Sequence, residues 1–222
     1  FFVVVFLMGP TVDAPIIEKP LPELSIEINA LPQWVKNQND AIPNIKPGNE
    51  SKVIFADSIP QKTKYAIVYL HGFSGSTSDG GPVHKEVAAA LGANIYLPRL
   101  YDHGLDTQEG LANYTGEKSM DSAREALAVG QLLGEKVILM GTSTGCTLAL
   151  ALAAQHPELA ALVLYAPNIR INHPLDFVAT LPWGLQIVRQ VEGGEYHNVA
   201  NSIPEKAQFW TMRYRLEAVV HM

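Results

Sequence analysis

The residue in this sequence best placed to do chemistry is Ser143, which stands in a G-x-S-x-G pattern at positions 141–145. The short apolar run Glu135–Met140 precedes the pattern and an Ala- and Leu-rich run follows it. Between a strand and a helix, this pattern is typical of a sharp turn that lifts the serine hydroxyl above the sheet edge, beside the positive end of the helix. Its two glycines are needed because side chains there would clash across the turn. An ordinary serine in a Gly-rich turn remains the alternative.

A second element fits the same chemistry. The run His71-Gly72-Phe73-Ser74-Gly75 follows Lys64–Leu70, an apolar stretch typical of a strand buried on both faces. In acyl transfer the carbonyl oxygen becomes an oxyanion, and each backbone N–H aimed at it contributes about 3 kcal/mol. By position, we expect the donors to be the amides of Phe73 and Thr144. We expect His71 to shape this loop rather than to act as a base.

Strands and helices are expected to alternate along the middle of the chain. The pattern predicts strands at 52–56, 64–70, 94–100, 135–140 and 159–166, and helices at 31–39, 83–91, 119–133 and 147–156. Ser122 with Glu125 could form a capping box in the third of these helices. Short connections between alternating elements predict an α/β fold with a mostly parallel sheet and helices on both faces. Beyond Pro167, helix-like pieces at 183–191 and 206–220 indicate a lid or cap over the sheet.

The two motifs, in this order and at this separation, resemble the α/β-hydrolase superfamily. More narrowly, they are similar to its carboxylesterase and monoacylglycerol-lipase-like branch, which also contains relatives of serine aminopeptidases. The resemblance covers residues 51–222 and is least specific in the lid, which is expected to follow the sixth strand of the fold. The run at 98–104 adds to it, because the branch often has a Pro-Arg…Gly-His-Gly turn there. Asp102 replaces the usual glycine of that turn, and His103 is expected to be a turn residue.

The resemblance implies a serine hydrolase that forms an acyl-enzyme on Ser143. We expect its substrate to be a small acyl ester, as for a carboxylesterase or a monoacylglycerol-lipase-like enzyme. A peptidase or thioesterase of the same fold is one alternative. A non-catalytic binding module of this fold is another, although such a module has no need of the two motifs.

A serine hydroxyl needs a histidine base that a carboxylate orients. In this superfamily the chain order is Ser, then Asp or Glu, then His. After Ser143 the only aspartate is Asp176, and the histidines are His156, His173, His197 and His221. Asp176 with His197 stays open as a pair, because a few relatives carry the acid after the sixth strand.

We expect instead that the fold is incomplete and that this chain alone is inactive. The missing C-terminal strands, with the acid and the base, would come from a longer parent chain or a second polypeptide. The apolar strand expected at 159–166 supports this, because as an open edge it would aggregate. A soluble, monomeric and cooperatively folded 222-residue chain would contradict it.

Composition narrows the classes of partner. The formal charge of −6, without a basic patch, argues against nucleic acid. A hydrophobic content of 47% with 17% charged residues indicates an ordered domain. Cys146 is the only cysteine, so no disulfide can form within the chain, and no metal-ligand spacing or phosphate-binding loop occurs. We expect neither a metal nor another cofactor.

The N-terminal run at 1–8 is wholly apolar and is followed by a stretch rich in Pro, Asn and acidic residues. Eight residues cannot span a bilayer, which needs about 20. We favour the tail of a signal sequence or membrane anchor over a buried strand, with residues 1–50 as anchor plus linker. The hydrolase core would then be 51–169 and the lid 170–222. The protein would be exported or membrane-anchored, and otherwise cytoplasmic.

Overall fold

The architecture was obtained as a computed structural model, which describes residues 2–170, 176–200, 203 and 205–222. Its main sheet has five strands in the order β1-β3-β2-β4-β5. Their bounds are Lys52–Ile54 for β1, Thr63–Leu70 for β2, Asn94–Leu97 for β3, Gly134–Thr142 for β4 and Ala161–Tyr165 for β5. Strand β1 runs antiparallel to β3, and the other pairs are parallel. The prediction of a mostly parallel sheet is confirmed.

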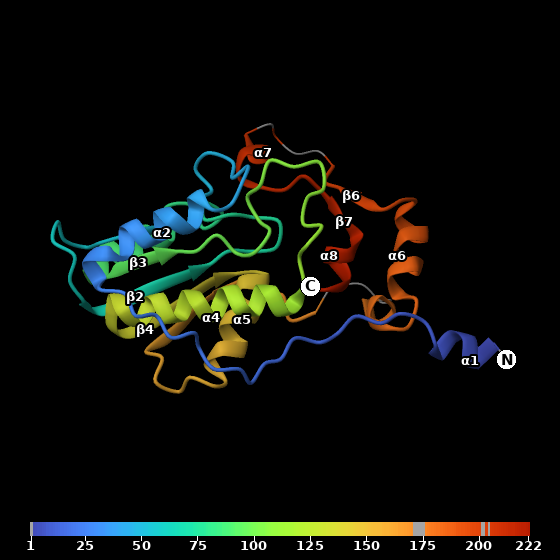
Figure 1. Cartoon of the computed structure of the whole chain (residues 1–222), viewed down its shortest axis with the longest axis horizontal. Coiled ribbons are helices and arrows are strands. Elements are labelled where there is room, and N and C mark those ends of the chain that lie inside the picture. Colours follow the sequence, from blue (N-terminus) through green and yellow to red (C-terminus); the bar gives the residue numbers. More distant parts are fainter. Residues whose placement is uncertain (1, 171–175, 201–202, 204) are drawn as a thin grey trace.

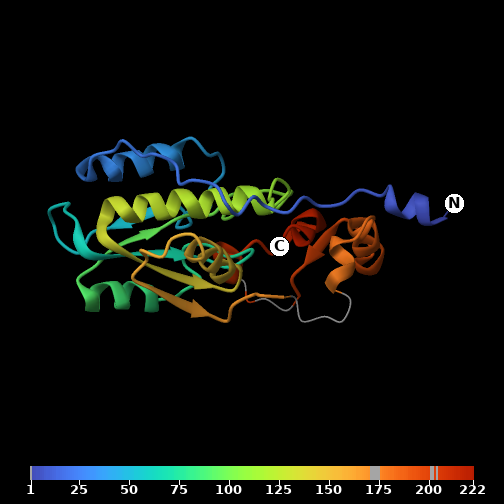
Figure 2. The ribbon, with the colours of Figure 1, turned by 90° about the horizontal axis from the view of Figure 1, so that it is seen from below.

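Helices cover both faces of the sheet because successive side chains of a strand point to opposite sides. Ala66, Val68 and Leu70 of β2 belong to one buried cluster, which Leu127 and Leu148 also join. That cluster lies under α2 (Leu31–Asp40), α4 (Gly116–Leu133) and α5 (Thr144–Ala153). Ile67 and Tyr69 belong to the second cluster, which α3 (Val83–Leu91) covers from the other side, as Figure 2 shows.

Helix α4 begins earlier than its sequence pattern indicates. Thr115 is the N-cap, and its side-chain oxygen accepts a hydrogen bond from the Lys118 amide at 3.2 Å. The capping box expected from Ser122 and Glu125 is wrong, since both residues lie inside the helix. The Ser122 hydroxyl donates to the Lys118 carbonyl at 3.1 Å and accepts from the Tyr101 amide at 3.1 Å.

The N-terminal run forms the short helix α1 (Phe2–Leu7), so the alternative of a buried strand is wrong. Leu7 and Met8 are exposed, and the chain then passes the lid, where the Trp183 amide donates to the Pro10 carbonyl at 3.0 Å. Figure 1 shows α1 at the end of the molecule where α6 also lies. In the part of the chain that is described, no helix has the length and apolar character required to cross a membrane.

The segment expected to be a plain linker takes part in the fold. Residues 11–27 run beside α4, where the Ile16 amide donates to Glu117 Oε2 at 2.6 Å. A short 3-10 helix, η1 (Ile28–Ala30), then leads into α2. Leu31 and Val35 of α2 are buried in the core cluster. The packing of the α/β core therefore begins well before residue 51.

The region expected from its sequence to form a lid, residues 170–222, is called the lid and has six short elements, counted over the described residues. They are η2 (Asp176–Thr180), α6 (Gly184–Glu192), β6 (Tyr196–Asn198), α7 (Lys206–Phe209), β7 (Arg213–Arg215) and α8 (Leu216–Val220). The helix-like piece expected at 206–220 is interrupted, because 213–215 pairs with β6 as an antiparallel ribbon. Figure 1 shows the lid beyond the carboxyl ends of the parallel strands.

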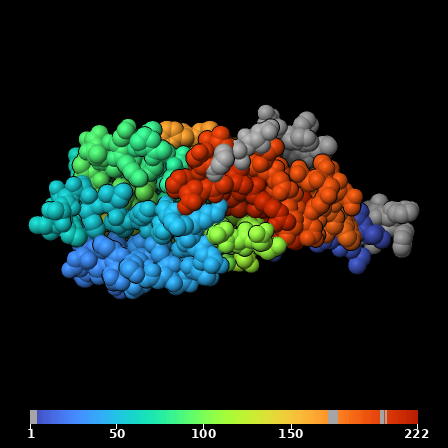
Figure 3. All heavy atoms as spheres, turned by 90° about the horizontal axis from the view of Figure 1, so that it is seen from above, coloured from blue at the N-terminus to red at the C-terminus, as the bar shows by residue number. Residues whose placement is uncertain are grey.

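The lid is fastened to the segment that precedes β1. The Lys46 ammonium donates to the carbonyls of Ala207 at 2.8 Å and Trp210 at 3.2 Å. The Asn49 amide group donates to the Gln208 carbonyl at 2.8 Å. In Figure 3 the C-terminal residues, in red, lie directly against this light-blue segment.

Candidate active site

Ser143 forms the turn between β4 and α5 and has a left-handed backbone, with φ 52° and ψ −116°. A non-glycine residue in such a conformation is strained and persists only when its surroundings hold it there. Here the Ser143 amide donates to the Tyr165 carbonyl at 2.9 Å, and the Ser143 carbonyl accepts from Asn168 at 3.2 Å. The end of β5 and the residues after it therefore hold the strained turn.

The two glycines of the pattern have no room for a side chain. A Cβ on Gly145 would lie 2.0 Å from the Leu70 carbonyl oxygen. A Cβ on Gly141 would lie 2.7 Å from the carbonyl carbon of Gly145. The close approach of the turn to the end of β2 therefore requires glycine at 145, as the sequence pattern predicted.

The loop after β2 is fixed by hydrogen bonds to one carbonyl group. The Gly72 carbonyl accepts from the Gly75 amide at 3.1 Å and lies 3.0 Å from His71 Nδ1. In a trans peptide the following N–H points in the opposite direction from this carbonyl. The hydrogen bonds to the Gly72 carbonyl therefore fix the direction of the Phe73 N–H, because both groups belong to the same planar peptide.

His71 is buried, and both of its ring nitrogens make backbone hydrogen bonds. Nε2 accepts from the Leu100 amide at 3.0 Å, so the proton is on Nδ1, which donates to the Gly72 carbonyl. Burial lowers the pKa of His71 to about 4, which keeps the ring neutral. These contacts agree with a residue that shapes the loop.

Two backbone donors remain free at this place. Among the described residues, neither the Phe73 amide nor the Thr144 amide has an acceptor within the protein. Thr144 is the first residue of α5, where the helix dipole favours negative charge. A Cβ on Gly72 would lie 3.3 Å from Ser143 Cβ, so the loop and the serine turn are in direct contact. Such an arrangement can hold an anionic oxygen beside the serine.

The Phe73 side chain joins this loop to the lid. Its ring makes edge-to-face contacts with Tyr114 at 5.4 Å and with Tyr214 of the lid at 5.2 Å between centroids. The Thr211 amide, also in the lid, donates to the Ser74 carbonyl at 2.7 Å. The lid thus rests on the loop that carries the Phe73 amide.

The backbone of the turn at 102–104 favours glycine at position 102. Asp102 has φ 62°, which glycine adopts freely and aspartate tolerates. Its carboxylate accepts from the Asn113 amide at 2.8 Å. His103 is buried, with Nδ1 2.8 Å from the Tyr101 carbonyl and its ring 4.9 Å from that of His71. This agrees with its expected place in the turn.

No described histidine contacts the Ser143 hydroxyl, which has no hydrogen-bond partner among the described residues. His156 lies 2.9 Å from Glu158, and His197 lies 3.1 Å from Glu192 while stacking on Tyr214. His173 lies outside the described residues, as does the side chain of Asp176, so the pairing of Asp176 with His197 stays an expectation.

Two other side chains, those of Cys146 and Asp79, contact the serine turn or the loop after β2. Cys146 is fully buried, and its thiol donates to the Gly141 carbonyl at 2.9 Å, as a structural helix residue would. Sequence reasoning overlooked Asp79, whose carboxylate accepts from the Gly72 amide at 2.7 Å. The available signal was a single acid within the Gly- and Ser-rich stretch 74–81.

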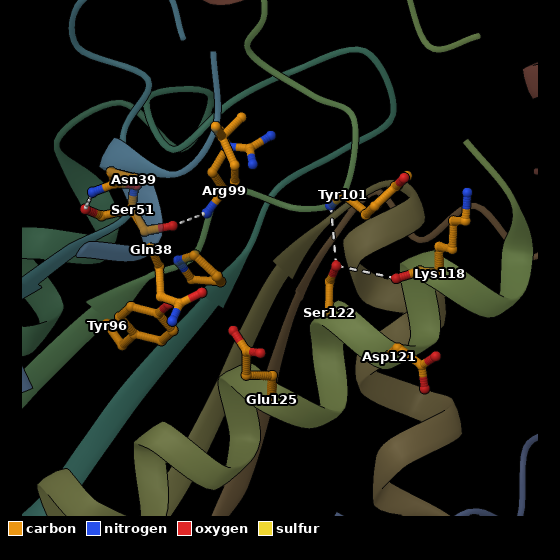
Figure 4. Close-up of a pocket in the computed structure, with 12 residues that line it drawn as sticks. Gln38, Asn39, Ser51, Tyr96, Arg99, Tyr101, Lys118, Asp121, Ser122 and Glu125 are labelled. Atoms are coloured by element: carbon orange, nitrogen blue, oxygen red, sulfur yellow. Dashed lines mark hydrogen bonds between the residues drawn. The ribbon is translucent and has the colours of Figure 1, made fainter. Parts of the chain in front are cut away.

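Hollows lie on two sides of this region. One of about 370 Å³, shown in Figure 4, lies between α2, the end of β3 and α4, and contains neither Ser143 nor Phe73. Another, of about 470 Å³, begins at Thr147 of α5 and extends to the lid. Its lining is largely apolar and includes Ile169, Phe177, Ala179, Val219, Val220 and Met222. Its lining also lacks Ser143 and Phe73, but it reaches the serine turn through Asn168, whose amide donates to the Ser143 carbonyl at 3.2 Å.

Known proteins are similar to this chain in sequence and in fold. The chain is 30% identical over 97 residues to a thermostable monoacylglycerol lipase from Bacillus sp. (strain H-257), covering 44% of this chain and 38% of the lipase. Its fold matches a structure from the metagenome-derived lipolytic enzymes LipS and LipT with a TM-score of 0.63 at 20% identity, over 80% of this chain and 68% of that one.

Another structure of similar fold is Est1E of Butyrivibrio proteoclasticus with bound ferulic acid. It matches with a TM-score of 0.50 at 14% identity, over 77% of this chain and 64% of that one. The alignment with the curated relative thus covers well under half of that enzyme. The model of the alpha/beta hydrolase family matches residues 67–219. The chain therefore belongs to the alpha/beta hydrolase family.

Proposed function

We propose that this chain carries the nucleophile and oxyanion site of a serine hydrolase that cleaves small acyl esters. The observation that supports this most is the left-handed backbone of Ser143 beside two backbone amides, of Phe73 and Thr144, that have no acceptor among the described residues. A strained serine next to unused donors serves no evident folding purpose, whereas acyl transfer needs both.

In this proposal Ser143 Oγ attacks the ester carbonyl carbon and its proton passes to a histidine base. The carbonyl oxygen becomes an oxyanion, which accepts hydrogen bonds from the Phe73 and Thr144 amides. Collapse of the tetrahedral intermediate breaks the bond to the alcohol, which leaves with the proton from the histidine. Water then hydrolyses the acyl-enzyme by the same steps and restores the serine.

The substrate class rests on two observations. The apolar hollow of about 470 Å³ beside the serine turn has the size and character of a small-molecule site. The named relatives include a monoacylglycerol lipase and lipolytic enzymes. An ester with a short or medium acyl chain fits both observations better than a peptide, although the oxyanion chemistry of a peptidase or thioesterase is the same.

We further propose that the catalytic acid and base come from outside the described residues. Among the described residues no hydrogen bond joins a histidine to Ser143: His156 pairs with Glu158, His197 pairs with Glu192, and His71 bonds to the backbone. Further strands beside β5, in a longer parent chain or a second polypeptide, would bring these two residues to the site. Sequence that continues past Met222 with an Asp loop and a His loop would support this proposal.

The test is covalent labelling of the full-length protein by a fluorophosphonate probe. We expect labelling at one site, its loss in Ser143→Ala, and its retention in Ser58→Ala, which removes an exposed serine far along the chain. Hydrolysis of a panel of short-chain p-nitrophenyl esters, thioesters and amino-acid anilides then separates the three activities. Absence of labelling in the full-length protein would refute the proposal and favour a non-catalytic binding module.

A further inference from the structure

The carboxylate of Asp79 links the two halves of the candidate site. Its Oδ2 accepts from the Gly72 amide at 2.7 Å, and its Oδ1 is in contact with the Tyr69 hydroxyl. The Tyr69 hydroxyl lies 2.7 Å from Thr142 Oγ1. Gly72 precedes Phe73, and Thr142 precedes Ser143, so this one chain of contacts joins the backbone on both sides of the reaction site.

The direction of each hydrogen bond follows from the number of protons available. Burial raises the pKa of Tyr69, so its hydroxyl stays protonated and has one hydrogen to donate. Burial raises the pKa of Asp79, and the hydrogen bonds from Tyr69 and Gly72 oppose that shift. In its ionised form the carboxylate only accepts, so Tyr69 donates to Asp79. The Thr142 hydroxyl must then donate to Tyr69. Thr142 therefore donates to Tyr69, and Tyr69 donates to Asp79, which also accepts from the Gly72 amide.

The loop is closed tightly around this carboxylate. A Cβ on Gly75 would lie 2.9 Å from Asp79 Oδ2, and one on Gly72 would lie 3.3 Å from the same atom. The ring of His84 stacks on Tyr69 with centroids 4.4 Å apart and closes the cluster from α3. A half-buried carboxylate is costly unless it is hydrogen-bonded, and here two donors compensate for its loss of water.

We propose that Asp79 is a positioning residue that sets the spacing between the Phe73 amide and Ser143. The role rests on the proposed function, since it matters for the rate only if Ser143 is acylated. Asp79 would touch neither substrate nor oxyanion. It would act by holding Gly72, and with it the Gly72–Phe73 peptide, at a fixed distance from the turn that presents the serine.

A purely positional role makes a specific prediction for two substitutions. In Asp79→Asn the amide oxygen can still accept from Gly72, while the amide nitrogen donates to Tyr69 and Tyr69 donates to Thr142. Every contact is thereby kept, with two bonds reversed. In Asp79→Ala all of them are lost. Because small misplacements of reacting groups cost up to about 100-fold, we expect acylation of Ala to be slower by about 10- to 100-fold and that of Asn to stay within about 3-fold.

The experiment measures two independent quantities in the full-length protein. The first is the rate constant of fluorophosphonate acylation, separated from probe affinity. The second is hydrogen exchange of the Gly72 amide by NMR, which does not depend on Ser143 reactivity. In Asp79→Ala we expect slower acylation at unchanged affinity and at least 10-fold faster Gly72 exchange. Asp57→Ala, which removes an exposed carboxylate elsewhere, should change neither quantity.

A second variant keeps the test decisive if Asp79→Ala does not fold. Tyr69→Phe removes the hydroxyl contacts with Asp79 Oδ1 and Thr142 but leaves the bond from the Gly72 amide to Asp79 Oδ2, so acylation should slow while the Gly72 amide stays protected. If Asn is as slow as Ala, the charge of Asp79 matters and the positional role is overturned; it is also overturned if Gly72 exchange is the same in all variants. If the wild-type protein is not acylated, the proposed function fails, while Gly72 exchange still decides whether the clamp exists.

Discussion

At the scale of single residues, the serine turn depends on a glycine, Gly145, whose neighbours leave no space for a side chain. Gly145 packs directly on the Leu70 carbonyl, whereas Gly194 in the lid has no atom within 4 Å of a built Cβ. The two glycines therefore form a matched pair for substitution, one in contact with the core and one in open space.

We expect Gly145→Ala to lower the free energy of unfolding by about 3 kcal/mol, because a Cβ 2.0 Å from a backbone oxygen forces the turn apart. Gly194→Ala should change it by less than about 0.5 kcal/mol. Urea unfolding at neutral pH measures both. Equal stabilities of the two variants would show that the turn and β2 are not in close contact.

His71 gives the loop a dependence on pH. Its pKa falls from the ordinary 6.5 to about 4 through burial, so between these values the unfolded chain binds a proton that the folded one does not. The contribution of His71 to the free energy of unfolding is therefore fully present above about pH 6.5. It is lost as the pH falls towards 4, by up to about 1.4 kcal/mol per pH unit. Burial lowers the pKa of His103 as well, which acts in the same direction.

We accordingly expect His71 alone to lower the free energy of unfolding by about 3 kcal/mol between pH 7 and pH 4.5, so the drop should be shallower in His71→Gln. Urea unfolding across this range measures the slope, which does not depend on how far the substitution destabilises the protein at pH 7. An unchanged slope in His71→Gln would mean that the ring is not buried in its neutral form.

At the scale of elements, one buried side chain of α4, Arg124, binds the backbone of the arm at 11–27. The Arg124 guanidinium contacts the Ile16 carbonyl, donates to the Ile17 carbonyl at 3.3 Å and pairs with Asp121 at 2.8 Å. The Ile16 amide in turn donates to Glu117. A buried arginine that binds backbone carbonyls fixes a segment that has no regular structure of its own.

Arg124→Met keeps the apolar stem and removes the guanidinium. We expect amides at 11–20 to exchange at least 10-fold faster, a loss of about 1.4 kcal/mol in local stability, while α4 keeps its protection. Hydrogen exchange with mass spectrometry resolves the two segments. Lys36→Met, which removes one exposed ion pair with Asp40, is the control and should leave the arm unchanged.

The elements that sequence reasoning predicted are those with a strong local signal. β2 and β4 are continuous apolar runs, and the G-x-S-x-G pattern located the turn between β4 and α5. The start of α4 was missed because Thr115, the real N-cap, lies outside the apolar stretch. Strand β7 was taken for helix because its pairing with β6 is a tertiary contact.

The candidate site divides in the same way. Ser143, Phe73 and Thr144 could be chosen from motifs, because strand ends and helix starts follow from local patterns. Asp79 could not, since its importance depends on Tyr69 and Thr142, which only folding brings together. The contact between the arm at 11–27 and α4 could not be predicted either, because its partner Arg124 is about a hundred residues away in the chain.

At the scale of the whole molecule, apolar side chains gather at the end where the N-terminal helix meets the lid. Leu7 is 67% exposed and Val191 of α6 is 81% exposed. Trp183 joins the two segments, since its ring nitrogen donates to the Val5 carbonyl at 3.3 Å. Exposed apolar groups of this kind can insert into the interfacial region of a bilayer. We propose that this end associates with membranes.

We expect Leu7→Asp to weaken co-sedimentation with phosphatidylcholine vesicles by about 5-fold, since burying one leucine contributes about 1.5 kcal/mol or more. The matched control is Ile59→Asp, because Ile59 is 71% exposed and belongs to the loop between β1 and β2, at the opposite end of the molecule. Equal binding of both variants and the wild type would contradict association through this end.

The contact between the lid and the loop at 73–74 constrains how a ligand could reach the serine. Thr211 and Tyr214 hold Ser74 and Phe73 from above, so swinging that part of the lid outward would also pull on the peptide that presents the Phe73 amide. An entrance there would displace the Phe73 amide, and with it the proposed anion site, each time it opened. The entrance for an acyl group should therefore lie on the other side of the serine, near Phe177 and Val219. Smaller side chains at these positions should speed turnover of bulky esters without changing how strongly the proposed site binds the oxyanion.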